Sequence, residues 1–283
     1  MTSPSTSPLA PLEHLIQLVD ATVDGAPSLE TIATGFPTLD RLLGGGVRRG
    51  DLIALGGDVG AGKSALALAI ALRAAARRSE VAYFSGEMRV ERVLERILAM
   101  EGRATIDDLR TGALDEAARA SVGAAALRLR EVMPRFSRMP RDGVESLAME
   151  ILALTDVELV VVDSLTCLPL GERTEGEALA AAVRTLKRAA VEARVALLMT
   201  TSLPRLDRTR PDPRPVLEDY GAMGGVAQLS DVVLGLYREE MYRPGYGTEG
   251  GTELLLLKNR NGKTGYLDLF FYKEWMRFED MVE

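Results

Sequence analysis

The stretch DLIALGGDVGAGKSALALAIAL, residues 51–72, decides the fold of this chain. Its opening, DLIALGG, is the nearly continuous apolar run that is typical of a strand buried on both faces. GDVGAGKS (57–64) follows and fits the pattern G-x-x-x-x-G-K-[ST], and an Ala/Leu-rich segment typical of a helix comes next. Strand, glycine-rich turn and helix in this order predict a loop whose backbone amides, together with the helix N-terminus, face phosphate oxygens.

The eight residues of this loop are the candidate nucleotide-binding residues. They are Gly57, Asp58, Val59, Gly60, Ala61, Gly62, Lys63 and Ser64. We expect Lys63 to lie against the β- and γ-phosphates of ATP and the hydroxyl of Ser64 to bind Mg²⁺. An ordinary strand-to-helix turn with a surface lysine is the alternative, which the flanking strand and helix disfavour.

Two acidic residues close other apolar runs of the chain. Asp163 ends VELVVVD (157–163), and Glu87 ends VAYFSGE (81–87). Ligands of open α/β sheets bind at the carboxyl ends of the strands. We expect Asp163 to hold the magnesium ion, because an unpartnered acid at such a position is costly. Glu87 is placed to align and polarise the water that attacks the γ-phosphate. For each residue the alternative role is to cap the following helix.

Alternating strand and helix patterns predict an α/β, RecA-like P-loop fold with a mostly parallel sheet flanked by helices. Besides the runs above, we expect strands at 195–201 and 231–237 and helices at 64–78, 89–100 and 176–193. ELLLLKNRNGKTGYLDLFFY predicts a C-terminal β-hairpin with a tight turn at Asn261-Gly262. We expect one motor domain over residues 31–283, preceded by a tail and a helix in residues 1–30.

The N-terminal segment combines a polar tail with an apolar stripe. Residues 1–11 are rich in Ser, Thr and Pro, which predicts a loose, disordered tail. Residues 11–25 predict a helix whose apolar side chains share one face: Leu12, Leu15, Ile16, Val19 and Val23. Such a stripe has to pack against something. Folding back onto its own domain and docking on a neighbouring subunit both remain open from this stretch alone.

Composition excludes several classes of protein. Asp plus Glu outnumber Lys plus Arg by 41 to 34, a net charge of −7, so a uniformly basic coat for nucleic acid is excluded, although a local basic lining is not. Cys167 and His14 are the single cysteine and histidine, which excludes an intramolecular disulfide, a Cys/His zinc site and a His-assisted nucleophile. The sequence has no signal-peptide pattern and no apolar run long enough to cross a bilayer, so we expect a cytoplasmic protein without membrane contact.

Two basic groups invite a functional interpretation. Lys258 and Arg260 are two apart on a strand, so they point to one side. They suit contact with a nucleotide on an adjacent subunit, whereas composition alone favours a solvated basic hairpin. The loop TTSLPRLDRTRPDPRP (200–215) carries Arg205, Arg208, Arg210 and Arg214. It suits either a pore lining that holds phosphate backbones or a solvated, Pro-stiffened surface loop.

In order along the chain, these pieces resemble the RecA-like motor domain of DnaB-type replicative helicases, from about Leu12 to Asp280. The matching stretches are TGFPTLDRLLGGGVRRGDLIAL, FSGEMRVERVLERILAMEGRATIDDLRTG, LVVVDSL, RPVLEDYGAMGGVAQLSDVVLGLYREEMY and LLLLKNRNGKTGYLDLFFYKEWMRFED. The resemblance implies an ATP- and Mg²⁺-dependent hexameric ring acting on single-stranded DNA, with ATP bound between subunits. It also implies that the N-terminal helix packs on the neighbour, and that Lys258 and Arg260 complete the neighbour's site.

The chain departs from this family pattern at three places. Thr201-Ser202-Leu203 stands where the family has Ser-Gln-Leu, Asp219-Tyr220-Gly221 stands where it has Asp-Leu-Arg, and Ala227 replaces an acid. The family's separate N-terminal domain has no counterpart in this sequence. These departures favour an accessory or divergent member with intact ATP hydrolysis and altered coupling to DNA.

Two alternatives remain from the sequence. A RecA/RadA- or KaiC-like ATPase would remodel a protein partner or bind DNA without unwinding it, and the acidic total favours a protein partner. A non-enzymatic module would use nucleotide to hold a ring together, which the presence of Glu87, Asp163 and the basic pair disfavours.

Overall fold

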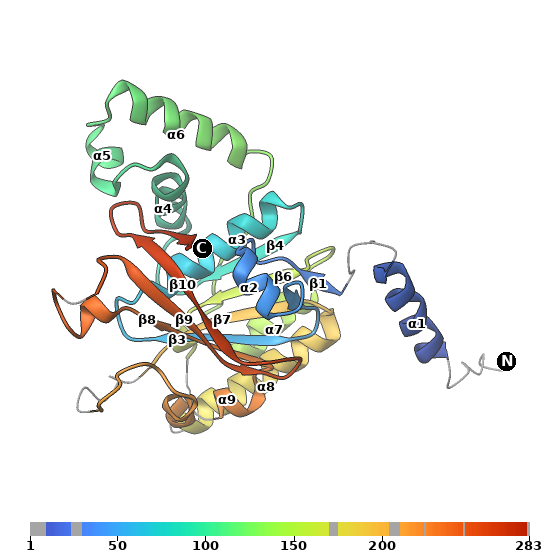
Figure 1. Ribbon diagram of the computed structural model, residues 1–283. Helices are drawn as coiled ribbons and strands as arrows, with labels where there is room; N and C mark the ends of the chain where they lie inside the picture. Colours follow the sequence, from blue (N-terminus) through green and yellow to red (C-terminus); the bar gives the residue numbers. More distant parts are fainter. Residues whose placement is uncertain are drawn as a thin grey trace.

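The computed structural model describes residues 10–23, 30–169, 175–203, 210–223, 225–245 and 247–281. Within them one nine-stranded sheet runs through the domain in the order β11-β10-β9-β8-β3-β7-β6-β4-β5 (Figure 1). Neighbouring strands from β8 to β5 are parallel, whereas β9, β10 and β11 are antiparallel. The predicted α/β fold with a mostly parallel sheet is therefore confirmed.

The strands that the sequence predicts all form. In chain order the large sheet contains β3 (Leu52–Gly57), β4 (Val81–Ser85), β5 (Arg135–Arg138), β6 (Leu159–Asp163), β7 (Ala196–Ser202), β8 (Val232–Tyr237), β9 (Gly251–Asn259), β10 (Gly265–Tyr272) and β11 (Arg277–Asp280). A separate small sheet joins β1 (Thr31–Ile32) to β2 (Val47–Arg48).

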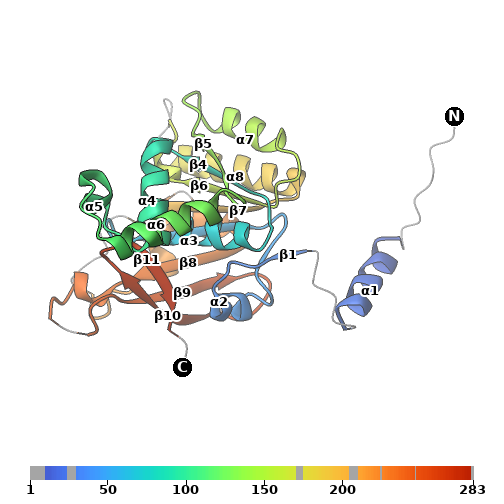
Figure 2. The ribbon, with the colours of Figure 1, turned by 90° about the horizontal axis from the view of Figure 1, so that it is seen from above.

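Helices cover both faces of the sheet (Figure 2). On one face lie α2 (Pro37–Leu42), α3 (Lys63–Ala76), α4 (Val90–Gly102), α5 (Ile106–Thr111) and α6 (Glu116–Leu129). On the other lie α7 (Val144–Leu152), α8 (Glu175–Ala193) and α9 (Val226–Leu229). Short 3₁₀ segments follow β6, β7 and β8 at Leu165–Cys167, Leu217–Met223 and Glu239–Met241.

The two hydrophobic cores lie on either side of the sheet, because successive side chains of a strand point to opposite faces. In β6, Leu159 and Val161 belong to the core under α3, while Val160 and Val162 belong to the core under α7 and α8. A strand buried on both faces needs apolar residues at every position, which explains the unbroken apolar run.

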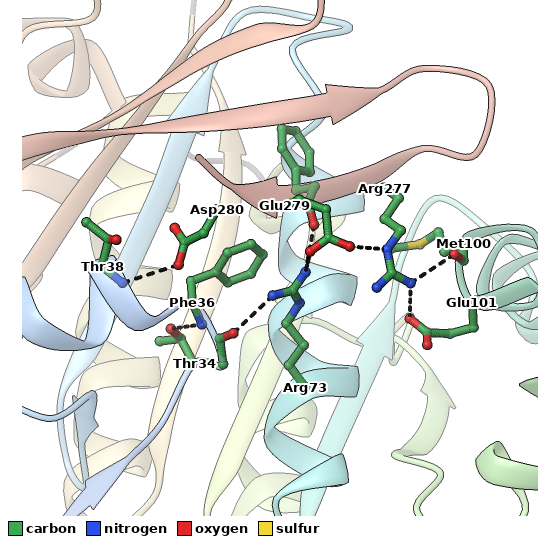
Figure 3. Close-up of polar contacts among 11 residues, drawn as sticks. Thr34, Phe36, Thr38, Arg73, Met100, Glu101, Arg277, Glu279 and Asp280 are labelled. Atoms are coloured by element: carbon green, nitrogen blue, oxygen red, sulfur yellow. Dashed lines mark hydrogen bonds and ion pairs between the residues drawn. The ribbon is translucent and has the colours of Figure 1, made fainter. Parts of the chain in front are cut away.

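The last strand is tied to α3 by a network of charged groups (Figure 3). Arg73 of α3 donates to the backbone oxygens of Gly35 and Phe278 and to the carboxylate of Glu279. Arg277 donates to the other oxygen of Glu279 and to Glu101 of α4. These bonds join β11 to the ends of α3 and α4 that lie far from the glycine-rich loop.

The C-terminal hairpin is confirmed, but its turn is longer than the predicted Asn261-Gly262 pair. Residues 260–264 connect β9 to β10, and neither Asn261 nor Gly262 takes the positive φ of a two-residue hairpin turn. The side chain of Asn259 accepts from the amide of Asn261 and donates to the backbone oxygen of Lys263. These bonds hold a wider loop closed.

The predicted N-terminal helix forms as α1 (Ala10–Val23) and lies away from the sheet in both views (Figures 1 and 2). Leu12, Leu15, Ile16 and Val19 each have more than half of their surface exposed. The expected tail falls almost wholly on residues 1–9, outside the described residues. No helix in the described ranges is long and apolar enough to span a bilayer.

Candidate nucleotide-binding site

The predicted phosphate-binding loop connects β3 to α3. Because β3, β4, β6, β7 and β8 are parallel, their carboxyl ends meet at the edge that carries this loop. Gly60 and Gly62 have φ values of +82° and +104°, which a residue with a Cβ rarely adopts. A Cβ at Gly62 would also lie 2.9 Å from the ring of Phe278. The glycines therefore allow the tight loop that places the N-terminus of α3 at the sheet edge.

Lys63 lies within this loop as a buried cation. Its side-chain nitrogen donates to the backbone oxygens of Gly57 at 3.2 Å and Asp58 at 3.0 Å. Burial lowers the pKa of Lys63, and the nearby carboxylates of Glu87, Asp58 and Asp163 oppose that shift. An ammonium group that exchanges two backbone oxygens for phosphate oxygens gains stronger, charge-assisted bonds.

Asp163, at the end of β6, is almost fully buried and accepts bonds from three hydroxyls. Ser64 donates to Oδ1 at 2.9 Å and Thr200 of β7 donates to the same oxygen at 2.5 Å. Tyr83 of β4 donates to Oδ2 at 2.7 Å. Burial and then the adjacent Asp163 raise the pKa of Tyr83 well above its ordinary value, so its hydroxyl stays protonated as a donor.

The Ser64–Asp163 pair suits magnesium in its chemistry. Mg²⁺ prefers oxygen ligands and is usually held by one or two protein groups together with water and substrate phosphates. The described residues contain no cluster of three or more His, Cys, Asp or Glu side chains that could hold a metal by themselves. A hydroxyl and a carboxylate beside a phosphate loop therefore fit a nucleotide-bound magnesium ion.

Glu87 reaches the same edge two residues beyond the end of β4. Its carboxylate accepts a bond from the hydroxyl of Ser164 at 3.1 Å and is exposed to solvent. The amide of Gly86 donates to the backbone oxygen of Asp163 at 2.7 Å, which holds this segment against the end of β6. The structure thus brings Lys63, Ser64, Asp163 and Glu87 together, as the sequence predicts.

Other residues around the loop escaped the sequence reasoning. Arg238, just after β8, donates to the backbone oxygen of Gly60 at 3.2 Å. Tyr242 donates to Asp58 at 3.1 Å and stacks on Tyr237. The signal that could have identified Tyr83, Thr200 and Arg238 is a polar side chain within an apolar strand or directly after one.

The basic pair Lys258 and Arg260 lies at the opposite edge of the sheet. Lys258 pairs with Val233 at the beginning of β8, whereas the loop-side end of β3, Gly57, pairs with Leu236. Three residues of strand separate Val233 from Leu236, about 10 Å, and Arg260 lies further still from the loop. The pair therefore lies too far along the strands to serve the phosphate loop of its own chain.

Both cations have partners on the α9 side of the sheet. Lys258 donates to the backbone oxygens of Ala227 and Gln228, and burial followed by the nearby Arg260 lowers its pKa. Arg260 donates to the buried carboxylate of Asp231 at 2.6 Å. Asp231 also accepts from Lys187 and from the amide of Leu52, so it would stay partnered without Arg260.

The predicted nucleic-acid contacts divide into two groups. Arg205 and Arg208 lie outside the described residues. Arg210 makes two 3.1 Å bonds to Asp219. Arg214 makes two 2.5 Å bonds to Glu253, and these bonds raise its pKa. Both arginines are compensated by internal carboxylates, so contact with phosphate would have to compete with an ion pair.

The departures from the family pattern also have defined places. Ser202 pairs with Gly57, the last residue of β3 before the phosphate loop. The backbone oxygen of Ala227 accepts a hydrogen bond from Lys258. Tyr220 is buried and donates to the backbone oxygen of Leu234 at 2.6 Å.

The model of the DnaB-like helicase C-terminal domain matches residues 31–280 of this chain. The chain belongs to that family. The replicative DNA helicase DnaB of Geobacillus stearothermophilus is 30% identical over 257 residues, which cover 88% of this chain and 56% of that protein. The replicative DNA helicase DnaC of Bacillus subtilis (strain 168) matches with the same identity and coverage, and DnaB of Leifsonia xyli is 28% identical over 274 residues.

Solved structures support the same fold for this member of the DnaB-like family. A solved ATPase domain superposes with a TM-score of 0.88 at 21% identity and covers 98% of this chain and 100% of that one. A DnaB-like replicative helicase studied with primase gives a TM-score of 0.86 at 21% identity, covering 99% of this chain and 68% of that one. The chain spans little more than half the length of the curated relatives that it matches.

Proposed function

We propose that this chain is an ATP- and Mg²⁺-dependent motor of the DnaB-like helicase class, which forms a homo-hexameric ring and acts on single-stranded DNA in the cytoplasm. The observation that carries the proposal is the bond between Ser64 and Asp163, with Lys63 and Glu87 at the same sheet edge. Membership of the DnaB-like family supports the choice of a DNA motor. Residues 31–283 would form the motor domain and residues 1–30 its N-terminal linker.

Each residue of the site has a distinct role in this proposal. The loop amides and Lys63 hold the β- and γ-phosphates, and Ser64 with Asp163 hold the magnesium ion, which neutralises phosphate charge. Glu87 accepts a proton from the attacking water and orients it toward the γ-phosphate. Its bond from Ser164 supports this role, because a carboxylate held by one hydroxyl keeps acceptor sites free for water.

The basic pair would act on the nucleotide of the adjoining subunit. Arg260 is half-exposed, and its partner Asp231 also accepts hydrogen bonds from Lys187 and from the amide of Leu52. The guanidinium can therefore leave Asp231 while the buried carboxylate keeps Lys187 as a counter-charge. A cation supplied from a neighbouring chain stabilises the charge that develops on the transferred phosphoryl group. The exposed apolar stripe of α1 would pack on the neighbour and hold the ring together.

The DNA part of the proposal has a specific rival. Arg210 and Arg214 are compensated by Asp219 and Glu253, and Gly221 stands where the family pattern has an arginine. These observations favour a RecA/RadA- or KaiC-like ATPase whose ring remodels a protein partner or binds DNA without unwinding it. A loader or other protein partner would then stimulate the ATPase in place of DNA.

The first test is ATP turnover by the wild-type chain with and without single-stranded DNA, followed by unwinding of a forked duplex. We expect Mg²⁺-dependent turnover that DNA stimulates. Lys63→Ala should lower turnover by about 100-fold or more, because it removes a preorganised cation from the transferring phosphates. Arg77→Ala, at the exposed far end of α3, is the matched control and should retain wild-type turnover.

The outcomes separate the parts of the proposal. Normal turnover by Lys63→Ala would show that the loop has been misassigned. An ATP turnover rate that single-stranded DNA does not change, with no unwinding by assembled rings, would contradict the helicase assignment. It would favour the protein-remodelling alternative. Tight ATP binding with negligible hydrolysis would contradict an enzymatic role altogether.

A further inference from the structure

The hydroxyl of Tyr83 is a polar group in a place where the core needs none. Tyr83 is 1% exposed, and its ring packs in the core under α3 with the ring of Phe136 at 5.4 Å. Phenylalanine would fill the same space. Burying a hydroxyl is costly unless it is hydrogen-bonded, and this one donates to Oδ2 of Asp163 at 2.7 Å. The feature that distinguishes tyrosine from phenylalanine here is therefore its bond to Asp163.

The bonds to Asp163 divide between its two oxygens. Oδ1 accepts from Ser64 and Thr200, whereas Oδ2 accepts from Tyr83. In the sheet, β6 lies between β7 and β4, so Thr200 and Tyr83 approach the carboxylate from the two flanking strands. Rotation of a carboxylate about its χ2 bond is otherwise soft, with a broad range of allowed angles. Donors on both oxygens fix that rotation.

We propose that Tyr83 is a positioning residue, whose hydroxyl holds the Asp163 carboxylate in the orientation that the Ser64–Asp163 pair needs to bind nucleotide-bound magnesium. The inference rests on the proposed function, since it concerns the same metal site. Groups that hydrogen-bond a ligand and orient it contribute to metal affinity without touching the metal, and their loss typically weakens affinity by about 10- to 100-fold.

The test is Tyr83→Phe, which removes one oxygen atom and keeps the ring. The probe is a fluorescent, non-hydrolysable ATP analogue, titrated at a series of Mg²⁺ concentrations. We expect the Mg²⁺ midpoint of analogue binding to rise by about tenfold, while binding without Mg²⁺ stays unchanged. The spectrum of Mn²⁺ bound with the analogue, measured by electron paramagnetic resonance, should change as well, because the orientation of the metal-holding carboxylate changes.

Tyr220→Phe is the matched control. It removes another fully buried tyrosine hydroxyl, one that donates to the backbone oxygen of Leu234 and not to Asp163. A general effect of losing a buried hydroxyl would appear in both variants. The inferred effect should appear in Tyr83→Phe and be absent from Tyr220→Phe.

The possible outcomes are distinguishable. An unchanged or lower Mg²⁺ midpoint in Tyr83→Phe would overturn the role of Tyr83 and leave the proposed function standing. A Tyr83→Phe chain that fails to fold would also overturn it, because the hydroxyl would then serve the fold and not the metal. A wild-type chain that binds the analogue without any dependence on Mg²⁺ would instead contradict the proposed function itself.

Discussion

At the scale of single residues, Glu279 shows how a charged network can join distant parts of the chain. Burial alone would raise the pKa of Glu279, but hydrogen bonds from Arg277 and Arg73 lower it below its ordinary value of 4.5. The same arginines bind the backbone oxygens of Gly35, Phe278 and Met100 (Figure 3). This network fixes β11 beside α3 and α4, the helices that follow the phosphate loop and Glu87 in the chain.

The lowered pKa predicts a pH dependence of stability. Because the folded chain holds this carboxylate ionised more strongly than the unfolded chain does, its contribution is complete above the unfolded pKa and is lost as the pH falls below about 4.5. Glu279→Gln should reduce the free energy of unfolding by about 1 kcal/mol at neutral pH. The difference from wild type should shrink at acidic pH, as measured by urea unfolding at several pH values.

Glu131→Gln is the control for this prediction, because Glu131 is exposed beside the same network. Its unfolding curves should follow those of wild type at every pH. A difference between Glu279→Gln and wild type that grows toward low pH would contradict the assignment of the ionised carboxylate to the folded state.

At the scale of elements, the 3₁₀ segment Leu217–Met223 is locked onto the strand that precedes the phosphate loop. A Cβ at Gly56 of β3 would lie 2.5 Å from Cζ of Tyr220, so glycine is needed there for space and not for its φ value. The hydroxyl of Tyr220 donates to the backbone oxygen of Leu234 in β8, the strand next to β3. The segment that departs from the family pattern at Asp219-Tyr220-Gly221 is therefore packed directly against β3.

This packing predicts a strong interaction between two substitutions. Gly56→Ala should destabilise the chain by about 1–3 kcal/mol, because the ring of Tyr220 has no room to move. The cost should be smaller in a Tyr220→Leu background, with a coupling of about 0.5–3 kcal/mol in the double-mutant cycle. The coupling is obtained from the free energies of unfolding of wild type, Gly56→Ala, Tyr220→Leu and the double variant.

Gly123→Ala is the matched control, since a Cβ at this position of α6 meets nothing within 4 Å. It should stabilise the chain by about 0.5–1 kcal/mol, as alanine does in a helix interior. Additive effects of Gly56→Ala and Tyr220→Leu would show that the two residues do not constrain one another.

At the scale of the whole molecule, the proposed nucleotide site would be complete only when two copies meet. Lys63 and Glu87 lie at the carboxyl edge of the parallel strands, while Arg260 lies at their amino edge. One surface of a subunit would therefore supply phosphate-binding groups, and another would supply the cation. A head-to-tail arrangement of this kind closes into a ring when its rotation allows it.

Mixed rings test this arrangement. Arg260→Ala should keep nucleotide binding nearly intact and lower hydrolysis by about 100-fold or more, because the cation acts on developing charge. Glu87→Ala should be inactive for lack of the group that activates water. When the two proteins are mixed, some interfaces join an intact Glu87 to an intact Arg260 and should regain turnover. Mixtures that form rings yet stay as inactive as their components would argue against donation between subunits.

The sequence by itself determined the local chemistry of this protein. The apolar run before Gly57, the spacing of glycines in the loop and the acids that close other strands follow from patterns of neighbouring residues. Those patterns predicted the central strands, the flanking helices and the placement of Lys63, Ser64, Asp163 and Glu87 at one edge. α6 escaped them, because its alanine-rich sequence shows little apolar periodicity and buries few residues.

Tertiary structure decided which of these local features meet. Strand order places β6 between β7 and β4, so Thr200 and Tyr83 reach Asp163 although 37 and 80 residues separate them from it in the chain. It also carries Arg260 to the far edge and Tyr220 onto Gly56. Apolar periodicity reports which face of a strand is buried but not which strand lies beside it, because neighbouring buried strands present similar apolar surfaces. Packing of the whole chain makes that choice.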